Sequence, residues 1–130
     1  MAWVEIVTLL AVVQLLVFGI LVGRARETYG IKAPATVGHE VFERYYRVQT
    51  NTVEMMLIFL PVLWIAAKYW SPHRMALIGV VYLIGRAVYC RGYVRDPKRR
   101  SVGFALSALP TLVLLVAALV GAIRAALIYY

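Results

Sequence analysis

Four long apolar stretches alternate with short polar segments along this chain. The apolar stretches cover about residues 3–23, 40–69, 75–94 and 102–128. Each is long enough to cross a hydrocarbon core of roughly 30 Å, since a helix rises about 1.5 Å per residue. The tight turn at 68–74 makes the second and third stretches antiparallel neighbours. The pattern predicts one all-α membrane domain over residues 1–130, a bundle of four transmembrane helices.

Composition supports a membrane protein. Hydrophobic residues make up 63% of the chain and the mean hydropathy is +0.79, beyond the usual range of soluble domains. The net charge of +8 raises nucleic acid as a partner, but the basic residues cluster in two loops beside apolar stretches. We therefore expect no nucleic-acid partner.

Two single residues within the apolar stretches are expected to serve helix packing. Cys90 is the one cysteine, and we expect it to pack between helices. We expect Gln14 to form an interhelical hydrogen bond.

The basic residues also predict an orientation. Eleven of the fourteen Lys and Arg residues fall within 24–47 and 86–100, while Lys68, Arg74 and Arg124 lie elsewhere. Positive charge concentrates on the cytoplasmic side of membrane proteins. The first and third connections are therefore predicted to be cytoplasmic, and both termini to lie on the opposite side of a multi-pass integral membrane protein.

The second stretch begins with polar residues. The segment HEVFERYYRVQTNTVE at 39–54 runs into an apolar block without Gly or Pro, which favours one continuous helix. On that helix Arg47, Asn51 and Glu54 share one face at i, i+4 and i+7. A carboxylate at membrane depth costs about 2.5–3.5 kcal/mol and normally has a partner. Glu54 and Arg47 either neutralise each other between packed helices or belong to a binding site.

The third stretch ends with polar residues in a mirrored arrangement. Arg86, Tyr89 and Tyr93 share a face at i, i+3 and i+7, and the basic loop RDPKRR follows with Arg100 at its end. The predicted topology brings these residues and the polar face of the second stretch into the same cytoplasmic half of the membrane. Such a set suits a small, flexible ligand with carboxylates and an ammonium group, because arginine binds carboxylates bidentately. Binding of anionic membrane lipid is the alternative.

The segments FERYYRVQTNTVE and RAVYCRGYVRDPKRRSVGF, in this order and on antiparallel helices, resemble the MAPEG family, the membrane-associated proteins in eicosanoid and glutathione metabolism. The match covers residues 26–104 and is similar to microsomal glutathione transferases and leukotriene C synthase. The resemblance implies a four-helix protomer, a homotrimer, and glutathione as co-substrate, bound between adjacent subunits at the cytoplasmic side.

The resemblance also implies roles for individual positions. The expected glutathione contacts are Arg26, Arg47, Gln49, Asn51, Glu54, Arg86, Tyr89 and Tyr93. Arg100, three residues before Gly103, matches the arginine that stabilises the thiolate in the family. One position departs from the pattern, since Met55 stands where leukotriene C synthase has a tyrosine.

These residue types suit thiolate chemistry. A thiol with a pKa near 8.5 is about 3% ionised at pH 7, and lowering that pKa by about two units, roughly 2.7 kcal/mol, makes about three quarters of it thiolate. The resemblance implies attack of this thiolate on a lipophilic electrophile, or reduction of a lipid hydroperoxide. The alternative is a non-catalytic lipid-binding scaffold, since the family includes the lipid-presenting five-lipoxygenase-activating protein. A transporter or purely structural bundle is a third possibility, although discontinuous helices and internal repeats are lacking.

Overall fold

The computed structural model describes residues 1–129, and these form four long helices joined by short connections. The elements are α1 (Ala2–Tyr29), α2 (Glu40–Tyr69), α3 (Pro72–Arg95), the short 3₁₀ helix η1 (Pro97–Arg99) and α4 (Arg100–Tyr129). All four long helices have the length and hydropathy to cross a membrane. Helices suit this composition because lipid offers no partner to an unpaired backbone group. The prediction of an all-α, four-helix chain is confirmed.

The helix ends follow from local residues. α1 stops at Tyr29 because Gly30 adopts a left-handed conformation, with φ 67°, and its N–H returns to the Arg26 carbonyl. His39 caps α2, where its Nδ1 accepts the Val41 N–H at 3.1 Å. Ser71 caps α3 in the same way. Two observed boundaries differ from those predicted from the sequence. α1 continues to Tyr29 beyond the predicted end at residue 23, and α4 already begins at Arg100, which was predicted to be the last residue of the basic loop.

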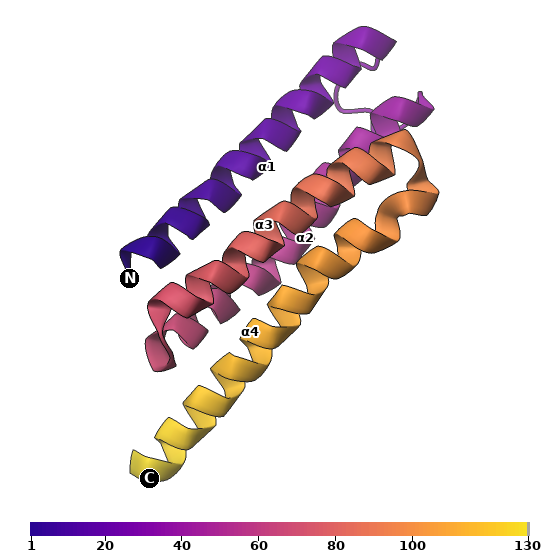
Figure 1. The fold of residues 1–130 in the computed structure, drawn as a ribbon. Helices are drawn as coiled ribbons and strands as arrows, with labels where there is room; N and C mark the ends of the chain where they lie inside the picture. Colours follow the sequence, from indigo (N-terminus) through magenta and orange to yellow (C-terminus); the bar gives the residue numbers. More distant parts are fainter. Residues whose placement is uncertain (130) are drawn as a thin grey trace.

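The four helices form an up-and-down bundle. In Figure 1, α2 and α3 lie between α1 and α4, and the two termini lie at the same end of the molecule. The core at that end includes Phe59 and Tyr82, whose stacked rings are 3.8 Å apart. Gln14 Nε2 donates to the Leu83 carbonyl at 2.9 Å and ties α1 to α3, which confirms the predicted interhelical bond. Cys90 is buried, as expected.

The closest helix pair is α3 and α4, and two glycines permit it. A Cβ at Gly85 would overlap the backbone of Leu106, and a Cβ at Gly103 would lie 2.7 Å from the Tyr89 Cβ. The backbone of α4 therefore lies directly against α3 at these two levels. This contact fixes the start of α4 beside the aromatic face of α3.

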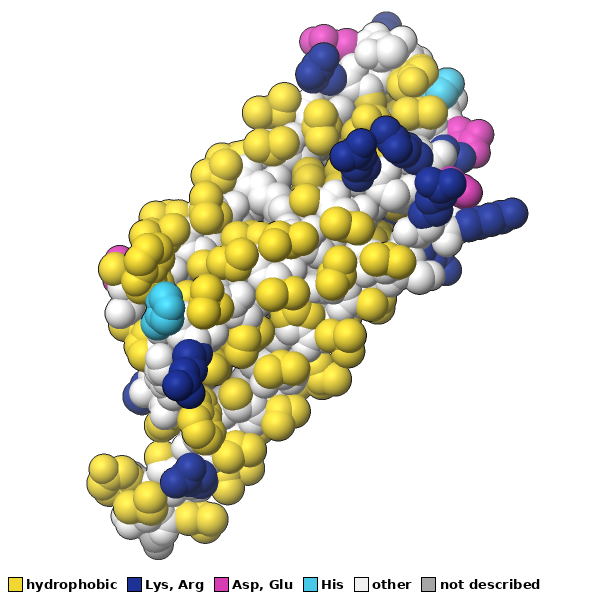
Figure 2. All heavy atoms as spheres, in the orientation of Figure 1, with side chains coloured by type: hydrophobic (Ala, Val, Ile, Leu, Met, Phe, Trp, Pro, Cys, Tyr) yellow, Lys and Arg dark blue, Asp and Glu magenta, His cyan; other side chains and the backbone are white. Residues whose placement is uncertain are grey.

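The surface divides into an apolar band and a basic end. Figure 2 shows hydrophobic side chains over the length of the bundle, with most of the visible Lys and Arg at one end and a few at the other. We call the end with most of them the basic end; it carries the α1–α2 connection at residues 30–39 and the α3–α4 connection at residues 96–99. His73, at the opposite end, lies in the first turn of α3 and is exposed, beside the Trp3 ring at 6.1 Å.

Candidate functional site

A polar cavity of about 400 Å³ opens at the basic end, between α2, α3 and the start of α4. We call it the reaction cavity. Its wall consists of Arg47, Asn51, Tyr89, Tyr93, Arg100, Ser101 and Phe104. The first five are among the residues singled out from the sequence, and they come from three different helices.

Helical geometry places each group in this wall. Arg47 and Asn51 are one turn apart on α2, and Tyr89 and Tyr93 are one turn apart on α3. The two tyrosine rings are nearly parallel, at an angle of 6°, with centroids 5.6 Å apart. Arg100 is the first residue of α4, so its side chain enters the cavity from the end nearest the connection.

Arg86 lies behind this wall and not in it. Its side chain is 0% exposed. Its Nη2 donates to Asn51 Oδ1 at 2.8 Å and to Thr52 Oγ1 at 2.9 Å, and its Nη1 donates to Ser107 Oγ at 3.3 Å. Its guanidinium also lies over the Tyr89 ring, 4.4 Å from the centroid. The family resemblance predicts a direct ligand contact from Arg86; in the structure it reaches the reaction cavity through Asn51 and Tyr89.

The hydroxyl groups around Arg86 are arranged as acceptors. Thr52 Oγ1 donates its own proton to the Val48 carbonyl at 2.7 Å, and Ser107 Oγ lies 3.1 Å from the Gly103 carbonyl. Each hydroxyl therefore directs a lone pair at the guanidinium. No carboxylate among residues 1–129 pairs with Arg86, so its charge is compensated by neutral dipoles and the Tyr89 ring.

This network orients the amide of Asn51. Because Oδ1 accepts from Arg86, the amide nitrogen is left to donate toward the reaction cavity. The cavity thus presents two exposed guanidinium groups, one amide donor and two phenols. A set dominated by donors and positive charge favours anionic groups such as carboxylates or a thiolate, and it disfavours cations.

Besides Arg86, three predicted contacts lie outside the reaction cavity. Arg26 donates to the Ala35 carbonyl at 2.6 Å and covers the Phe42 ring at 4.8 Å, so it joins α1 to the following loop and α2. Gln49 faces α1, because its Nε2 would lie 3.2 Å from a Cβ at Gly19. Glu54 is exposed on α2, and no ion pair to Arg47 forms within residues 1–129.

The structure adds cavity residues that sequence reasoning missed. Ser101 and Phe104 line the reaction cavity beside Arg100. Their place follows from α4 beginning at Arg100, because Phe104 is then about one turn further along the helix. The prediction of a loop up to Arg100 concealed that spacing.

Comparison with known proteins gives a consistent result. The sequence model of the MAPEG family matches residues 4–120. An uncharacterized protein of Synechocystis sp. is 48% identical, over 90% of this chain and 85% of its own length. Human microsomal glutathione S-transferase 2 is 40% identical, over 78% of this chain and 69% of its own. Leukotriene C4 synthase of Cavia porcellus is also 40% identical, over 94% of this chain and 87% of its own length.

Proposed function

The chain belongs to the MAPEG family, and on that premise we propose that it is a membrane-bound transferase that conjugates glutathione to lipophilic electrophiles. The observation that carries the proposal is the reaction cavity itself. Four residues that match the family's glutathione contacts line a single cavity together with Arg100, which matches its thiolate-stabilising arginine, and these five residues come from three helices. Two of its relatives are named for transfer of glutathione or synthesis of leukotriene C4.

Glutathione has two carboxylates, one ammonium group and a thiol. Arg47 is exposed at the cavity and provides a fork for one carboxylate, while the amide of Asn51 and the phenols of Tyr89 and Tyr93 supply further hydrogen bonds. A carboxylate for the ammonium group is absent from the described wall. We propose that Glu54, three residues after Asn51 on the same face of α2, supplies it.

Arg100 is the proposed catalytic residue. Its guanidinium reaches the reaction cavity beside Ser101, and a cation near the sulfur favours the thiolate over the thiol. The thiolate attacks an electrophilic carbon of the substrate and forms a C–S bond; the leaving group departs, or a ring opens, with the electron pair. Reduction of a lipid hydroperoxide is a further reaction that the same thiolate supports.

An apolar substrate has a route to the thiolate along Phe104. This ring lines the reaction cavity and is 45% exposed, and α4 continues from it with many exposed apolar side chains. A lipophilic electrophile can therefore approach from the bilayer, and glutathione from the basic end. We propose that the basic end is cytoplasmic, in accordance with the distribution of Lys and Arg.

We propose a homotrimer, because one protomer leaves the site incomplete. Arg26, Gln49 and Glu54 lie outside the reaction cavity, and the exposed carboxylate of Glu54 borders an apolar segment without an ion-pair partner among residues 1–129. A neighbouring subunit can cover Glu54 and bring its own polar groups to the cavity. Glutathione would then lie between adjacent subunits.

The test is glutathione consumption by the purified protein in mild detergent. An aryl halide reports conjugation, and a fatty-acid hydroperoxide reports peroxidase activity. We expect turnover with the aryl halide and loss of that turnover in Arg100→Ala. Glutathione binding without turnover of either substrate would instead support a lipid-binding scaffold, and absence of glutathione binding would refute the proposal.

A further inference from the structure

A second cavity lies on the other side of the α3–α4 pair. It has a volume of about 420 Å³ and is lined by Val88, Arg91, Gly92, Arg95, Lys98, Arg99, Ser101 and Val102. We call it the outer groove. It shares Ser101 with the reaction cavity and no other residue, so the first turn of α4 separates the two.

The outer groove belongs to a different face of α3. At about 100° per residue, Val88, Arg91 and Arg95 point roughly 120–180° away from the mean direction of Tyr89 and Tyr93. The close approach of η1 to α3 forms its floor, since a Cβ at Gly92 would lie 3.1 Å from the Arg99 carbonyl oxygen. Arg99 is thereby held against the outer face of α3.

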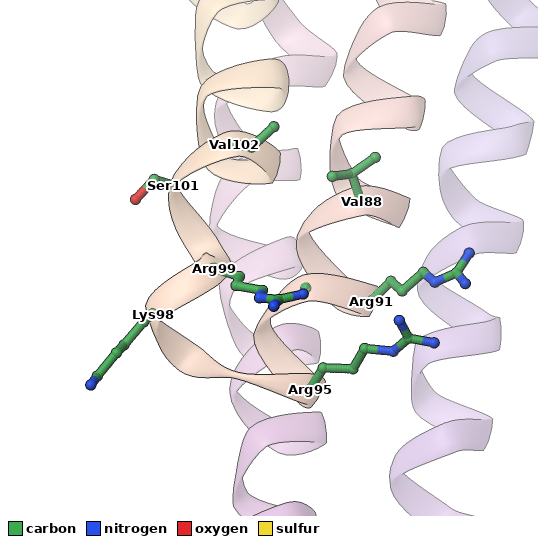
Figure 3. A pocket seen from close by; sticks show the side chains of 8 residues that line it. Val88, Arg91, Arg95, Lys98, Arg99, Ser101 and Val102 are labelled. Carbon is green, nitrogen blue, oxygen red and sulfur yellow. The ribbon is translucent and has the colours of Figure 1, made fainter.

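Three guanidinium groups line the outer groove. Figure 3 shows Arg99 extending toward α3 from the other wall, whereas Arg91 and Arg95 extend from α3 on the side away from Arg99, toward α1, and Lys98 points away from α3. No ion pair within residues 1–129 involves any of them. The nearby Asp96 accepts the Lys98 N–H at 3.0 Å and thereby caps η1. The lining of the groove therefore carries positive charge that no described side chain neutralises.

The groove is also apolar at one end. Val88 and Val102 lie on the side toward the middle of the bundle, and Val102 is 64% exposed. A ligand that fits both ends has an anionic head and a hydrocarbon tail. A soluble anion would leave the apolar end uncovered, and a zwitterionic lipid would bring its own cation into an already cationic site.

We propose that the outer groove binds the phosphate of an anionic phospholipid, with one acyl chain lying over Val88 and Val102. Guanidinium groups bind phosphate bidentately, and basic pockets between helices at the cytoplasmic surface hold lipid head groups. The bound lipid joins α3 to the start of α4 from outside.

The experiment is native mass spectrometry of the protein in detergent, titrated with dioleoylphosphatidylglycerol and, separately, with dioleoylphosphatidylcholine. The test variant is Arg95→Gln/Arg99→Gln. The matched control is Arg24→Gln/Lys32→Gln, which removes two exposed charges from the same end of the bundle but outside the groove. We expect the dissociation constant for phosphatidylglycerol to rise about tenfold or more in the test variant and less than about twofold in the control. Phosphatidylcholine should bind weakly to all three proteins.

Three results would overturn the proposal. Equal losses in the test and control variants would mean a general attraction of the basic end for anionic lipid. Equal binding of the two lipids would remove the role of charge. Displacement of phosphatidylglycerol by inorganic phosphate at similar concentration would identify a soluble anion as the occupant. If the double variant is not monodisperse, Arg95→Gln alone is compared with Lys32→Gln, and the same outcomes apply.

Discussion

Replacing Arg86 by methionine separates ligand orientation from stability. The change removes the guanidinium but keeps much of the side-chain volume at a position that is 0% exposed. Three hydrogen bonds from a charged donor disappear, each contributing about 1.5–3 kcal/mol. The desolvation of a buried charge, several kcal/mol, disappears as well. The two terms oppose each other, so we expect the free energy of unfolding to change by no more than about 2 kcal/mol.

Glutathione affinity should respond more strongly to the same change. Without Arg86 the Asn51 amide loses the bond that directs its nitrogen toward the reaction cavity. We expect the dissociation constant for glutathione to rise about tenfold, about 1.4 kcal/mol. Calorimetric titration in detergent measures it, and thermal unfolding checks the stability.

A double-mutant cycle decides whether Arg86 acts through Asn51. If it does, Arg86→Met adds little to the loss already caused by Asn51→Ala. Full additivity of the two losses, or unchanged affinity in a folded Arg86→Met protein, would refute the positioning role. A direct contact between Arg86 and glutathione predicts the additive result.

Three further predictions concern the site and the assembly. Arg47→Ala and Glu54→Ala should each weaken glutathione binding about tenfold, since each removes a charge-assisted contact, and unchanged affinity in calorimetry would leave both as structural charges. Gly103→Ala should destabilise the protein by about 1–3 kcal/mol in thermal unfolding, because the new Cβ would overlap the backbone of Tyr89, and an unaltered melting temperature would contradict the packing of α4 on α3. Cross-linking and mass measurement in mild detergent should give a trimer, and a stable monomer that still binds glutathione would refute the shared site.

The fold was largely predictable because apolar stretches of this length have few alternatives to helix in a membrane. Four residues of the reaction cavity were predictable from helical spacing. The spacing of Arg47 and Asn51, and of Tyr89 and Tyr93, fixes which residues share a face of one helix. Their meeting in one cavity follows from the antiparallel order of α2 and α3.

Depth and partner helices were not predictable from spacing. Arg86 shares its helix face with Tyr89, but Thr52 and Ser107, on two other helices, draw it into the core. Gln49 is two residues from Arg47 and therefore faces α1 instead of the cavity. The start of α4 was also hidden in a basic run, where three consecutive cations look alike in the sequence. The structure separates them, since Arg99 lines the outer groove and Arg100 lines the reaction cavity.

That separation supplies the most direct test of the proposed chemistry. Arg99→Ala and Arg100→Ala remove the same charge from adjacent positions, and only Arg100 lines the reaction cavity. The measurement is the ultraviolet absorbance of glutathione thiolate on the protein as a function of pH. We expect Arg100→Ala to raise the pKa of the bound thiol by about two units, toward 8.5, and to lower turnover near pH 7, whereas Arg99→Ala should leave the titration unchanged. Equal, small effects of the two substitutions would contradict the proposed role of Arg100.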